Sequence, residues 1–347
     1  MSFRRSALLV LLLAVLVALA VAAGAWFGYL RFAAAPIAGP APGAGVVVRR
    51  GDGFRAVIGR LREAGVHQGR DYEWLLLGRM TGAAGHIKAG EYALVPGLSP
   101  RTLLQNMRDG RTIQHRFTLV DGWNIRQLRA ALAQAEPLRH ASAGMDDAAL
   151  MQAIGHAGQH PEGRFLPETY LYQRGDSDLD VLRRAHAGMD KALAEAWDAR
   201  APSLPLKTRD EALALASIVE KETGAADERA KIAGVFVRRL QKGMLLQTDP
   251  TVIYGMGEAY DGNIRKRDLL ADTPHNTYTR AGLPPTPIAM PGRSALQAAT
   301  HPAPGDALYF VAIGDGSGRH VFSSSLDAHN AAVAAYLRNR RAAGPAP

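Results

Sequence analysis

One apolar stretch decides the fold of this chain: Leu213-Ala214-Leu215-Ala216-Ser217-Ile218-Val219-Glu220-Lys221-Glu222-Thr223-Gly224. Thr208 followed by Glu211 is a capping box just ahead of it, and Gly224 is a natural residue to follow a helix C-terminus. We therefore predict a helix from about residue 209 to about residue 223. Because this helix is apolar nearly all round, it should lie in the interior of a domain.

Two acids occupy the last turn of the predicted helix, Glu220 and Glu222. The helix macrodipole disfavours negative charge there, and burial acts in the same direction, so the pKa of a carboxyl at this end should be raised. A carboxyl that stays protonated near neutral pH is suited to general acid catalysis. The alternative is that both are surface acids beside Lys221 on a fraying helix end.

Helical phase separates the two acids. At 100° per residue, Glu222 lies about 160° around the helix from Glu220, so the two do not form a facing pair. Ala216, Ser217 and Gly224 share the face of Glu220. Because these residues are small, we expect space for a ligand against that face.

Composition narrows the class of protein. The chain has 347 residues, of which 47% are apolar, enough for one large or two medium domains. It has no cysteine, which excludes disulfides, thiolate metal sites and a lipid-modified cysteine. The net charge of +9 favours a polyanionic partner such as nucleic acid, anionic lipid or an acidic wall polymer. The arginines do not cluster in a run, so we expect no nucleic-acid partner.

Residues 7–30 form an unbroken apolar run that as a helix is about 36 Å long, enough to cross a bilayer. Trp26 and Tyr29 fall where an interfacial aromatic belt would lie. A cleaved signal peptide is the alternative, but its apolar core is shorter and ends at a small-residue cleavage site. We predict an uncleaved single-pass anchor, with residues 1–6 as a cytoplasmic tail.

The rest of the chain predicts a mixed α+β protein. Residues 31–45 are an uncharged Ala/Pro/Gly linker. Residues 46–111 alternate short strand and helix patterns and read as a small α+β subdomain. Residues 112–340 read as a larger α+β domain, in which residues 244–307 carry no regular pattern. Residues 341–347 are expected to be disordered.

Polar and aromatic residues that suit glycan binding gather after the acid helix. Amide, hydroxyl and carboxylate groups can hydrogen-bond sugar hydroxyls, and an aromatic ring can stack on a sugar face. Each residue taken alone is equally well explained as a turn or packing residue. The candidates are Gln247, Thr248, Asp249, Asn276 and Tyr278.

Several other chemistries lack their motifs. There is no His-Glu-x-x-His zinc motif, and the 11 histidines are scattered, so no metal site and no cofactor are expected. Ser217 and Lys221 are four residues apart and no Lys-Thr-Gly occurs, which excludes a penicillin-binding serine enzyme. The glycine-rich turn at residues 314–318 precedes no helix and is not a phosphate loop.

Several ordered motifs resemble one family. Residues 217–223 read Ser-Ile-Val-Glu-Lys-Glu-Thr, and residues 246–255 read Leu-Gln-Thr-Asp-Pro-Thr-Val-Ile-Tyr-Gly. Together with further motifs, they resemble the YceG-like family of endolytic murein transglycosylases. Met290 is a departure, since the family often has a polar residue there. The further motifs lie at residues 162–170, 276–278, 282–285, 309–312 and 329–330.

The resemblance implies a fold, a location and a role for single residues. It implies one helix in the cytoplasmic (inner) membrane, a LysM-like subdomain at residues 46–111 and a catalytic domain at residues 112–340, both on the periplasmic side. It makes Glu220 the catalytic residue, with Glu222 and the five polar-loop residues binding substrate. The implied partners are peptidoglycan glycan strands, the membrane and penicillin-binding proteins.

The implied reaction uses one carboxyl. Glu220 would cleave the MurNAc–GlcNAc bond and leave a 1,6-anhydro-MurNAc end, terminating nascent strands near the membrane. Glycoside hydrolysis normally needs two carboxylates across the bond, and no second one faces Glu220 from the same helix. Hydrolysis and a non-catalytic, membrane-anchored peptidoglycan-binding protein are the alternatives.

Overall fold

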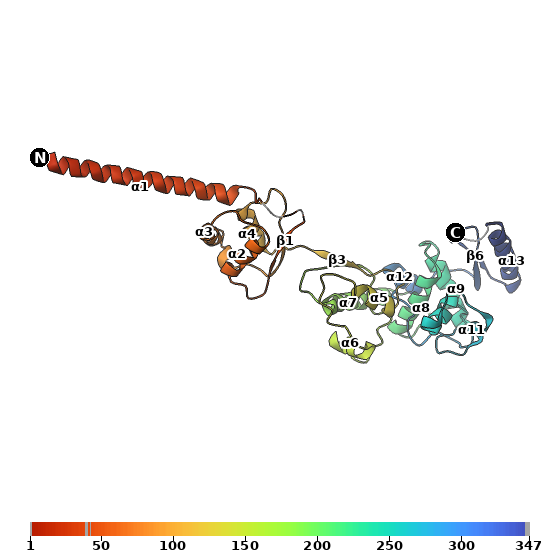
Figure 1. Ribbon diagram of the computed structural model, residues 1–347. Helices are drawn as coiled ribbons and strands as arrows, with labels where there is room; N and C mark the ends of the chain where they lie inside the picture. Colours follow the sequence, from red (N-terminus) through yellow and green to blue (C-terminus); the bar gives the residue numbers. More distant parts are fainter. Residues whose placement is uncertain (1, 39–40, 42, 344–347) are drawn as a thin grey trace. The chain divides into compact units, whose positions relative to one another are not determined.

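The computed structural model describes residues 2–38, 41 and 43–343, and it divides into two compact units. The first unit comprises Met1–His115 with Tyr172–Gly175, and the second comprises Arg116–Leu171 with Asp176–Pro347. Strands β3 (His115–Thr118) and β4 (Thr169–Tyr172) pair with each other and carry the chain across the boundary. The predicted mixed α+β class is confirmed (Figure 1).

Helix α1 (Ser2–Ala34) is one continuous helix (Figure 1). Ala7–Ala34 is the one helix among the described residues that is long and apolar enough to cross a membrane. The helix continues past the predicted end at residue 30, into the predicted linker. Its last turns are part of a folded core, because Phe32 is only 7% exposed and its ring meets Trp74 edge to face at 5.3 Å.

The first unit packs three helices against a two-stranded sheet. Strand β1 (Gly45–Val48) pairs antiparallel with β2 (Gly90–Ala93), with Val46 opposite Tyr92. Trp74, Leu103 and Met107 are fully buried between the elements. The first unit thus has mixed α+β content, and it includes α1 as well as the predicted subdomain range 46–111. Its helices are α2 (Phe54–Glu63), α3 (Asp71–Met80) and α4 (Pro100–Asp109), with a short 3-10 turn at Ala83–Gly85.

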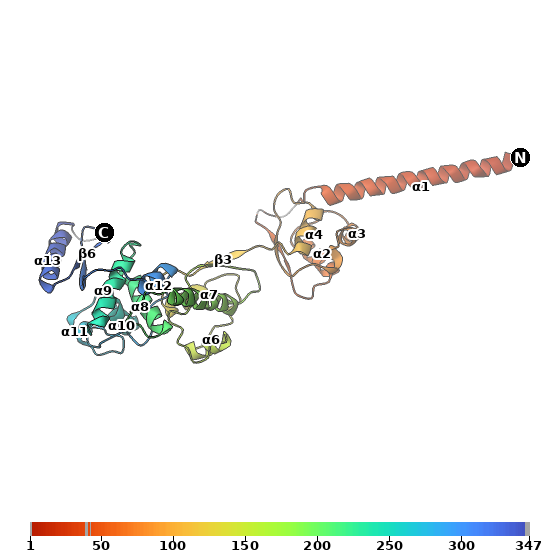
Figure 2. The ribbon, with the colours of Figure 1, turned by 180° about the vertical axis from the view of Figure 1, so that it is seen from behind.

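The second unit is organised around helix α8 (Arg209–Glu222). Helices α7 (Asp178–Asp198), α9 (Arg229–Gln241), α10 (Asp249–Met256) and α12 (Arg293–Thr300) all contact it, and both views show α8 among them (Figures 1 and 2). The remaining elements are α5 (Ile125–Leu132), α6 (Asp147–Ala153), a 3-10 turn at Gly257–Ala259, α11 (Lys266–Leu270), β5 (Tyr309–Ala312), β6 (His320–Ser323) and α13 (Leu326–Ala343).

Helices α10, α11 and α12 lie where the sequence predicts irregular structure. Asp249 and Pro250 open α10 in its first turn, where a missing backbone N–H costs nothing. Helix α11 has only five residues, too few to show an apolar period. These helices depend on packing against α8 and on each other, and such contacts are not visible in a local pattern.

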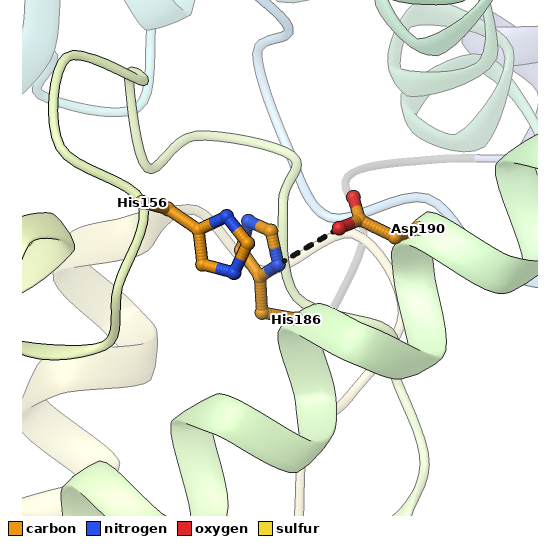
Figure 3. Close-up of side chains that lie close together, drawn as sticks. All are labelled: His156, His186 and Asp190. Carbon is orange, nitrogen blue, oxygen red and sulfur yellow. Dashed lines mark ion pairs between the residues drawn. The ribbon is translucent and has the colours of Figure 1, made fainter.

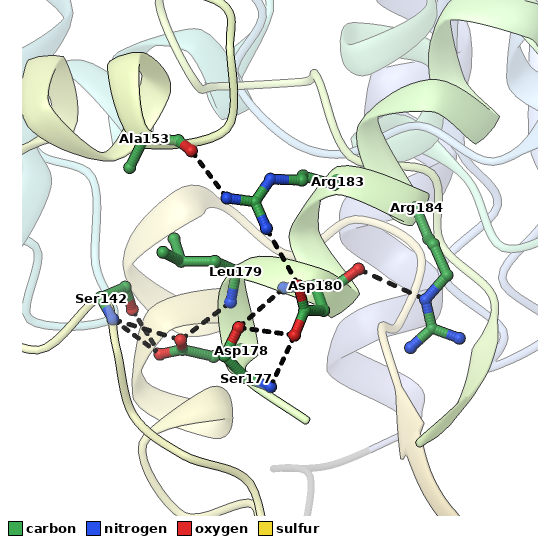
Figure 4. Close-up of polar contacts among 8 residues, drawn as sticks. All are labelled: Ser142, Ala153, Ser177, Asp178, Leu179, Asp180, Arg183 and Arg184. Carbon is green, nitrogen blue, oxygen red and sulfur yellow. Dashed lines mark hydrogen bonds and ion pairs between the residues drawn. The ribbon is translucent and has the colours of Figure 1, made fainter. Parts of the chain in front are cut away.

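The start of α7 is fixed by a polar cluster (Figure 4). Ser177 caps the helix, its side chain accepting from the amide of Asp180, while Asp180 accepts from the amide of Ser177. Asp178 accepts from the hydroxyl and amide of Ser142, and Arg183 joins Asp180 to the carbonyl of Ala153. These contacts hold α7 against the segment around α6.

The docked end of α1 leads to a stability prediction. Phe32→Ala should lower the free energy of opening of the first unit by about 3 kcal/mol, because it removes a buried ring from the core. Hydrogen exchange of the amides in β1 and α4, measured on the full chain in detergent, reports this free energy. Phe27→Ala is the matched control, since Phe27 is 71% exposed. Equal effects of the two variants would contradict the docking of α1.

Candidate active site

Helix α8 is the interior helix that the sequence predicts. The Thr208 hydroxyl oxygen accepts the amide N–H of Glu211 at 3.1 Å, and every residue from Ala212 to Val219 is buried. Its end differs from the prediction. Thr223 ends the helix in an extended conformation, and Gly224 does not adopt the left-handed conformation expected of a glycine cap.

Glu220 is held from two sides at the end of α8. Its side chain is 4% exposed. Oε2 accepts the backbone N–H of Gly292 at 2.9 Å, and Oε1 lies 3.3 Å from the guanidinium of Arg229. Both contacts are suited to a carboxylate, so the side chain is fixed between the start of α12 and the first turn of α9.

The small-residue face beside Glu220 is not open space. Ser217 is fully buried, and its hydroxyl oxygen accepts the backbone N–H of Ile288 at 2.9 Å. The segment at residues 288–292 therefore covers the face on which we expected room for a ligand. Met290 belongs to this segment and is fully buried, with its backbone paired to Gly122 and Trp123. Its position is structural, which accounts for an apolar residue there.

A second carboxylate lies near Glu220, from a part of the chain that the sequence did not single out. Asp121 is exposed. A Cβ placed on Gly292 would lie 2.4 Å from Asp121 Oδ1, so this carboxylate and Glu220 both border Gly292. Asp121 comes from the turn after β3, roughly a hundred positions before α8, and only the fold brings the two acids together.

Glu222 points to a different place, as the helical phase predicts. It lines a cavity of about 530 Å³ between α8, α9, the start of α10 and the C-terminal elements. Four of the five predicted polar-loop residues line the same cavity: Gln247, Thr248, Asp249 and Tyr278. The other lining residues are Arg239, Leu246, Tyr309, Phe310, Val311, Leu326, His329, Asn330 and Val333.

The carboxyl of Glu222 has the environment that the sequence suggested for a general acid. Burial raises its pKa to about 7, and the negative charge of Asp249 acts in the same direction. The Thr248 hydroxyl donates a hydrogen bond to Glu222 and opposes this rise. Tyr278 in turn donates to Asp249 Oδ1 at 2.6 Å. The cavity therefore contains one carboxyl that is partly protonated at neutral pH.

Asn276 does not line this cavity. It is 1% exposed, and its side-chain oxygen accepts the amide N–H of Tyr278 at 2.8 Å. Its side-chain nitrogen donates to the carbonyl oxygens of Asp268, Leu269 and Ala271. All of its polar atoms are thus used within the protein, and Asn276 positions Tyr278 instead of facing a ligand.

Arg239 was missed by sequence reasoning, and the motifs at residues 309–312 and 329–330 were noted without a binding role. The guanidinium of Arg239 donates to the carbonyl oxygens of Leu246 and Leu308 and lies 5.1 Å from the ring centre of Tyr309. His329 stacks on Tyr309 with ring centres 5.2 Å apart. These contacts join α9 to the hairpin of β5 and β6 and to α13, a pairing that no local motif predicts.

Glu162 is a second buried acid in this unit. It has no exposed surface, and burial raises its pKa to about 7. Oε2 accepts the amide N–H of Ile125 at 3.1 Å, the first residue of α5. Glu162 is the first residue of the motif at residues 162–170. Its carboxylate binds the start of α5 and does not line the cavity of Glu222.

The raised pKa of Glu222 predicts a pH dependence of stability. A carboxyl whose pKa rises from 4.5 to about 7 on folding contributes stability that is present below pH 4.5 and is lost as the pH rises through 7. Glu222→Gln removes this loss, on the order of 3 kcal/mol. Denaturant unfolding from pH 4.5 to pH 8 should therefore show a flatter profile for the variant.

Thr248→Val is the matched control for that experiment. It removes the hydrogen bond that lowers the pKa of Glu222, so the loss of stability should extend to higher pH than in the wild type. Identical pH profiles for wild type and Glu222→Gln would show that this carboxyl does not titrate as inferred. The buried Glu162 is unchanged in all three proteins.

Comparison with known proteins identifies the family. The chain is 32% identical over 276 residues to the endolytic murein transglycosylase of Bacillus subtilis, covering 75% of each chain. It is 26% identical over 287 residues to the protein of the same name from Streptococcus pneumoniae, a match that covers 73% of this chain and 51% of the relative.

A solved structure and a family model agree with this. The crystal structure of a putative YceG-like protein from Listeria monocytogenes matches with a TM-score of 0.52 at 27% identity, covering 83% of this chain and 98% of that one. The model of the YceG-like family matches residues 46–335, most of the chain. The chain belongs to the YceG-like family, whose members include proteins named endolytic murein transglycosylases.

Proposed function

We propose that this protein is an endolytic lytic transglycosylase that cleaves the MurNAc–GlcNAc bond within peptidoglycan strands. The observation that carries the proposal is the last turn of α8. It holds one carboxyl that is anchored by a cation and an amide, and a second that lines a cavity with four polar-loop residues. The names of the relatives support the choice of murein as the substrate.

Glu220 is the proposed catalytic residue. In the first step its carboxyl protonates the oxygen that links MurNAc to GlcNAc, and the bond from that oxygen to the anomeric carbon breaks. In the second step the carboxylate takes the proton of the C6 hydroxyl of the same MurNAc, whose oxygen attacks the anomeric carbon. The product carries a 1,6-anhydro ring, no water is consumed, and Glu220 regains its proton.

The base step is the reason to prefer Glu220 over Glu222. A residue that acts as acid and then as base must be stable as a carboxylate during turnover. Arg229 and the amide of Gly292 stabilise negative charge on Glu220. Burial and the neighbouring carboxylate of Asp249 disfavour the charged form of Glu222, and the hydrogen bond from Thr248 offsets them only in part. A substrate that displaces Arg229 from Oε1 would allow Glu220 to hold the proton needed for the first step.

The cavity beside Glu222 is the proposed glycan-binding subsite. Its volume of about 530 Å³ is within the usual range for small-molecule pockets. Gln247, Thr248 and Asp249 offer an amide, a hydroxyl and a carboxylate to sugar hydroxyls, and Tyr278 offers a ring face. Glu222 adds a carboxyl that can donate or accept. Asn276 acts indirectly, through the position of Tyr278.

The membrane setting extends the proposal. Ala7–Ala34 as a helix is about 42 Å long, and a hydrocarbon core is about 30 Å thick. We propose that α1 anchors the protein in the cytoplasmic membrane, with a cytoplasmic N-terminus and both units in the periplasm. Because α1 ends inside the core of the first unit, this LysM-like unit would lie at the membrane surface. Nascent strands and the penicillin-binding proteins that make them are the expected partners there.

Asp121 supports a second candidate, a hydrolase. Glycosidases use two carboxyls, about 5–5.5 Å apart when they retain configuration and about 6.5–9.5 Å apart when they invert it. Asp121 is exposed and borders Gly292, whose amide N–H binds Glu220. In a hydrolase, Asp121 would activate water or attack the sugar. A non-catalytic peptidoglycan-binding protein is the remaining alternative, and in it neither acid would affect glycan cleavage.

Glu220→Gln should abolish release of anhydromuropeptides from murein sacculi, a loss of at least about 100-fold. The amide keeps the shape and can still accept from Gly292, but it cannot transfer a proton. Glu222→Gln is the matched control on the same helix turn. It should mainly raise KM and leave most of kcat. Full activity of a folded Glu220→Gln protein would refute the assignment, and loss of kcat only in Glu222→Gln would transfer the role to Glu222.

Asp121→Asn separates the two enzymatic candidates. Transglycosylation should continue within a few-fold, because Glu220 alone supplies both proton transfers, whereas hydrolysis should fall by about 100-fold or more. Mass spectrometry of the products gives an independent answer, since hydrolysis adds a water molecule and leaves a reducing MurNAc end. Reducing ends together with an inactive Asp121→Asn variant would establish the hydrolase.

A further inference from the structure

Two histidines and an aspartate meet beside helix α7, outside the candidate active site (Figure 3). His186 and Asp190 are four residues apart on α7 and therefore share one face of the helix. His156 comes from the segment after α6, and its ring stacks on that of His186 with ring centres 3.6 Å apart. The possible ligand atoms of the three side chains lie within 4.8 Å of one another.

The hydrogen bonding of His186 leaves one ring nitrogen without a donor role. Nε2 lies 3.1 Å from Gln159 Oε1, an acceptor, so Nε2 carries the proton of the neutral ring. Nδ1 then presents its lone pair, and among the residues that the structure describes it has no hydrogen-bond partner. Yet Nδ1 lies 3.2 Å from Asp190 Oδ2, at an angle that makes no hydrogen bond. A lone pair and a carboxylate oxygen thus face each other and need a cation between them.

A proton is a poor candidate for that cation. His186 has no exposed surface, and burial disfavours the charged imidazolium. The stacked ring of His156 would also repel a second positive charge if both were protonated. A metal ion meets the same need with both imidazoles neutral, which is the form in which histidine binds metals.

We propose that His156, His186 and Asp190 form a site for a divalent transition-metal ion of the zinc type. In tetrahedral coordination with bonds of 2.0–2.1 Å, neighbouring ligand atoms are about 3.3 Å apart. The 3.2 Å between His186 Nδ1 and Asp190 Oδ2 matches this edge. The hydrogen bond from Nε2 to Gln159 is the outer contact that metal-bound histidines usually make.

The third ligand closes the site by moving. The ligand atoms lie within 4.8 Å of one another, so a small movement of the half-buried ring of His156 from its stack on His186 would bring all three to one ion. The side chain of Asp190 is 48% exposed, which gives the ion a path from solvent and leaves the fourth position to water. The ion would fasten the segment after α6 to α7. That segment leads directly to the buried Glu162. The bound ion would therefore stabilise the position of residues 155–161 against α7.

The sequence indicated no metal site, because its histidines are scattered. His186 and Asp190 have a helical chelating spacing, but two ligands of this kind are common by chance. The third ligand comes from thirty positions earlier, and only the fold brings the segment after α6 beside α7. The proposal is independent of the reaction that the enzyme catalyses.

Metal titration of the full chain in detergent tests the proposal. After chelator treatment, Zn²⁺ should bind saturably at one ion per chain by calorimetry, and Co²⁺ should give the visible absorption of a four-coordinate ion. Asp190→Asn and His156→Gln should each weaken Zn²⁺ binding at least about 10-fold, the minimum usually seen even for an outer-shell partner. Both side chains keep some exposure, so the variants should fold.

Matched controls make the result decisive. Asp198→Asn lies on the same helix and His67→Gln is an exposed histidine of the first unit, and both should bind Zn²⁺ as the wild type does. Zn²⁺ should also slow proteolysis between residues 155 and 161 in the wild type and not in Asp190→Asn. Absence of saturable binding, or equal affinity of Asp190→Asn and Asp198→Asn, would overturn the site and leave the stacked histidines as packing residues.

Discussion

Burial of helix α8 is the constraint on which the second unit depends. Its residues from 212 to 219 are small or apolar around the whole circumference, so the helix must be covered on all sides. Helices α7, α9, α10 and α12 supply that cover. The first turn of α8 carries exposed polar residues, and in its last turn two carboxyls leave the helix in directions about 160° apart. The proposed catalytic carboxyl of Glu220 and the proposed binding subsite at Glu222 thus lie on opposite sides of one helical turn.

The two carboxyls differ because their neighbours differ. Arg229 and the Gly292 amide surround Glu220, whereas Glu222 has Thr248 as its donor and Asp249 as a nearby negative charge. Burial raises the pKa of Glu222, whereas the carboxyl two residues earlier contacts a cation. Enzymes commonly place titratable groups in unlike environments in this way, so that each can take a separate role.

The first unit depends on a different constraint, the end of α1. The sequence predicts an apolar helix to residue 30 and then an Ala/Pro/Gly linker over residues 31–45. Instead, Phe32 packs on Trp74 and the helix continues to Ala34. In the proposed anchoring, a helix that ends in a folded core cannot swing freely, so the first unit would keep a defined distance from the membrane. Phe32, just beyond the apolar run, makes this contact. Its partner Trp74 lies about forty positions away in the chain, so the contact cannot be predicted from the local sequence.

The sequence by itself determined the interior helix, its N-terminal cap, the divergence of its two acids and the mixed α+β class. These features follow from local spacing and residue type, which act within a few turns of chain. It also named Gln247, Thr248, Asp249 and Tyr278, with Glu222, as binding candidates, and the fold brings these five residues to one cavity. Asn276 was named with them, although its amide is used up by backbone carbonyls.

Tertiary structure alone decided what each side chain meets. The cation beside Glu220, the cover over Ser217, the approach of Asp121 to Gly292 and the junction of His156 with His186 all join segments far apart in the chain. Such contacts leave no periodic or local trace, because they depend on how whole helices pack around α8. The pKa of a buried carboxyl is likewise set by the groups around it in space, so residue type and spacing alone do not predict it.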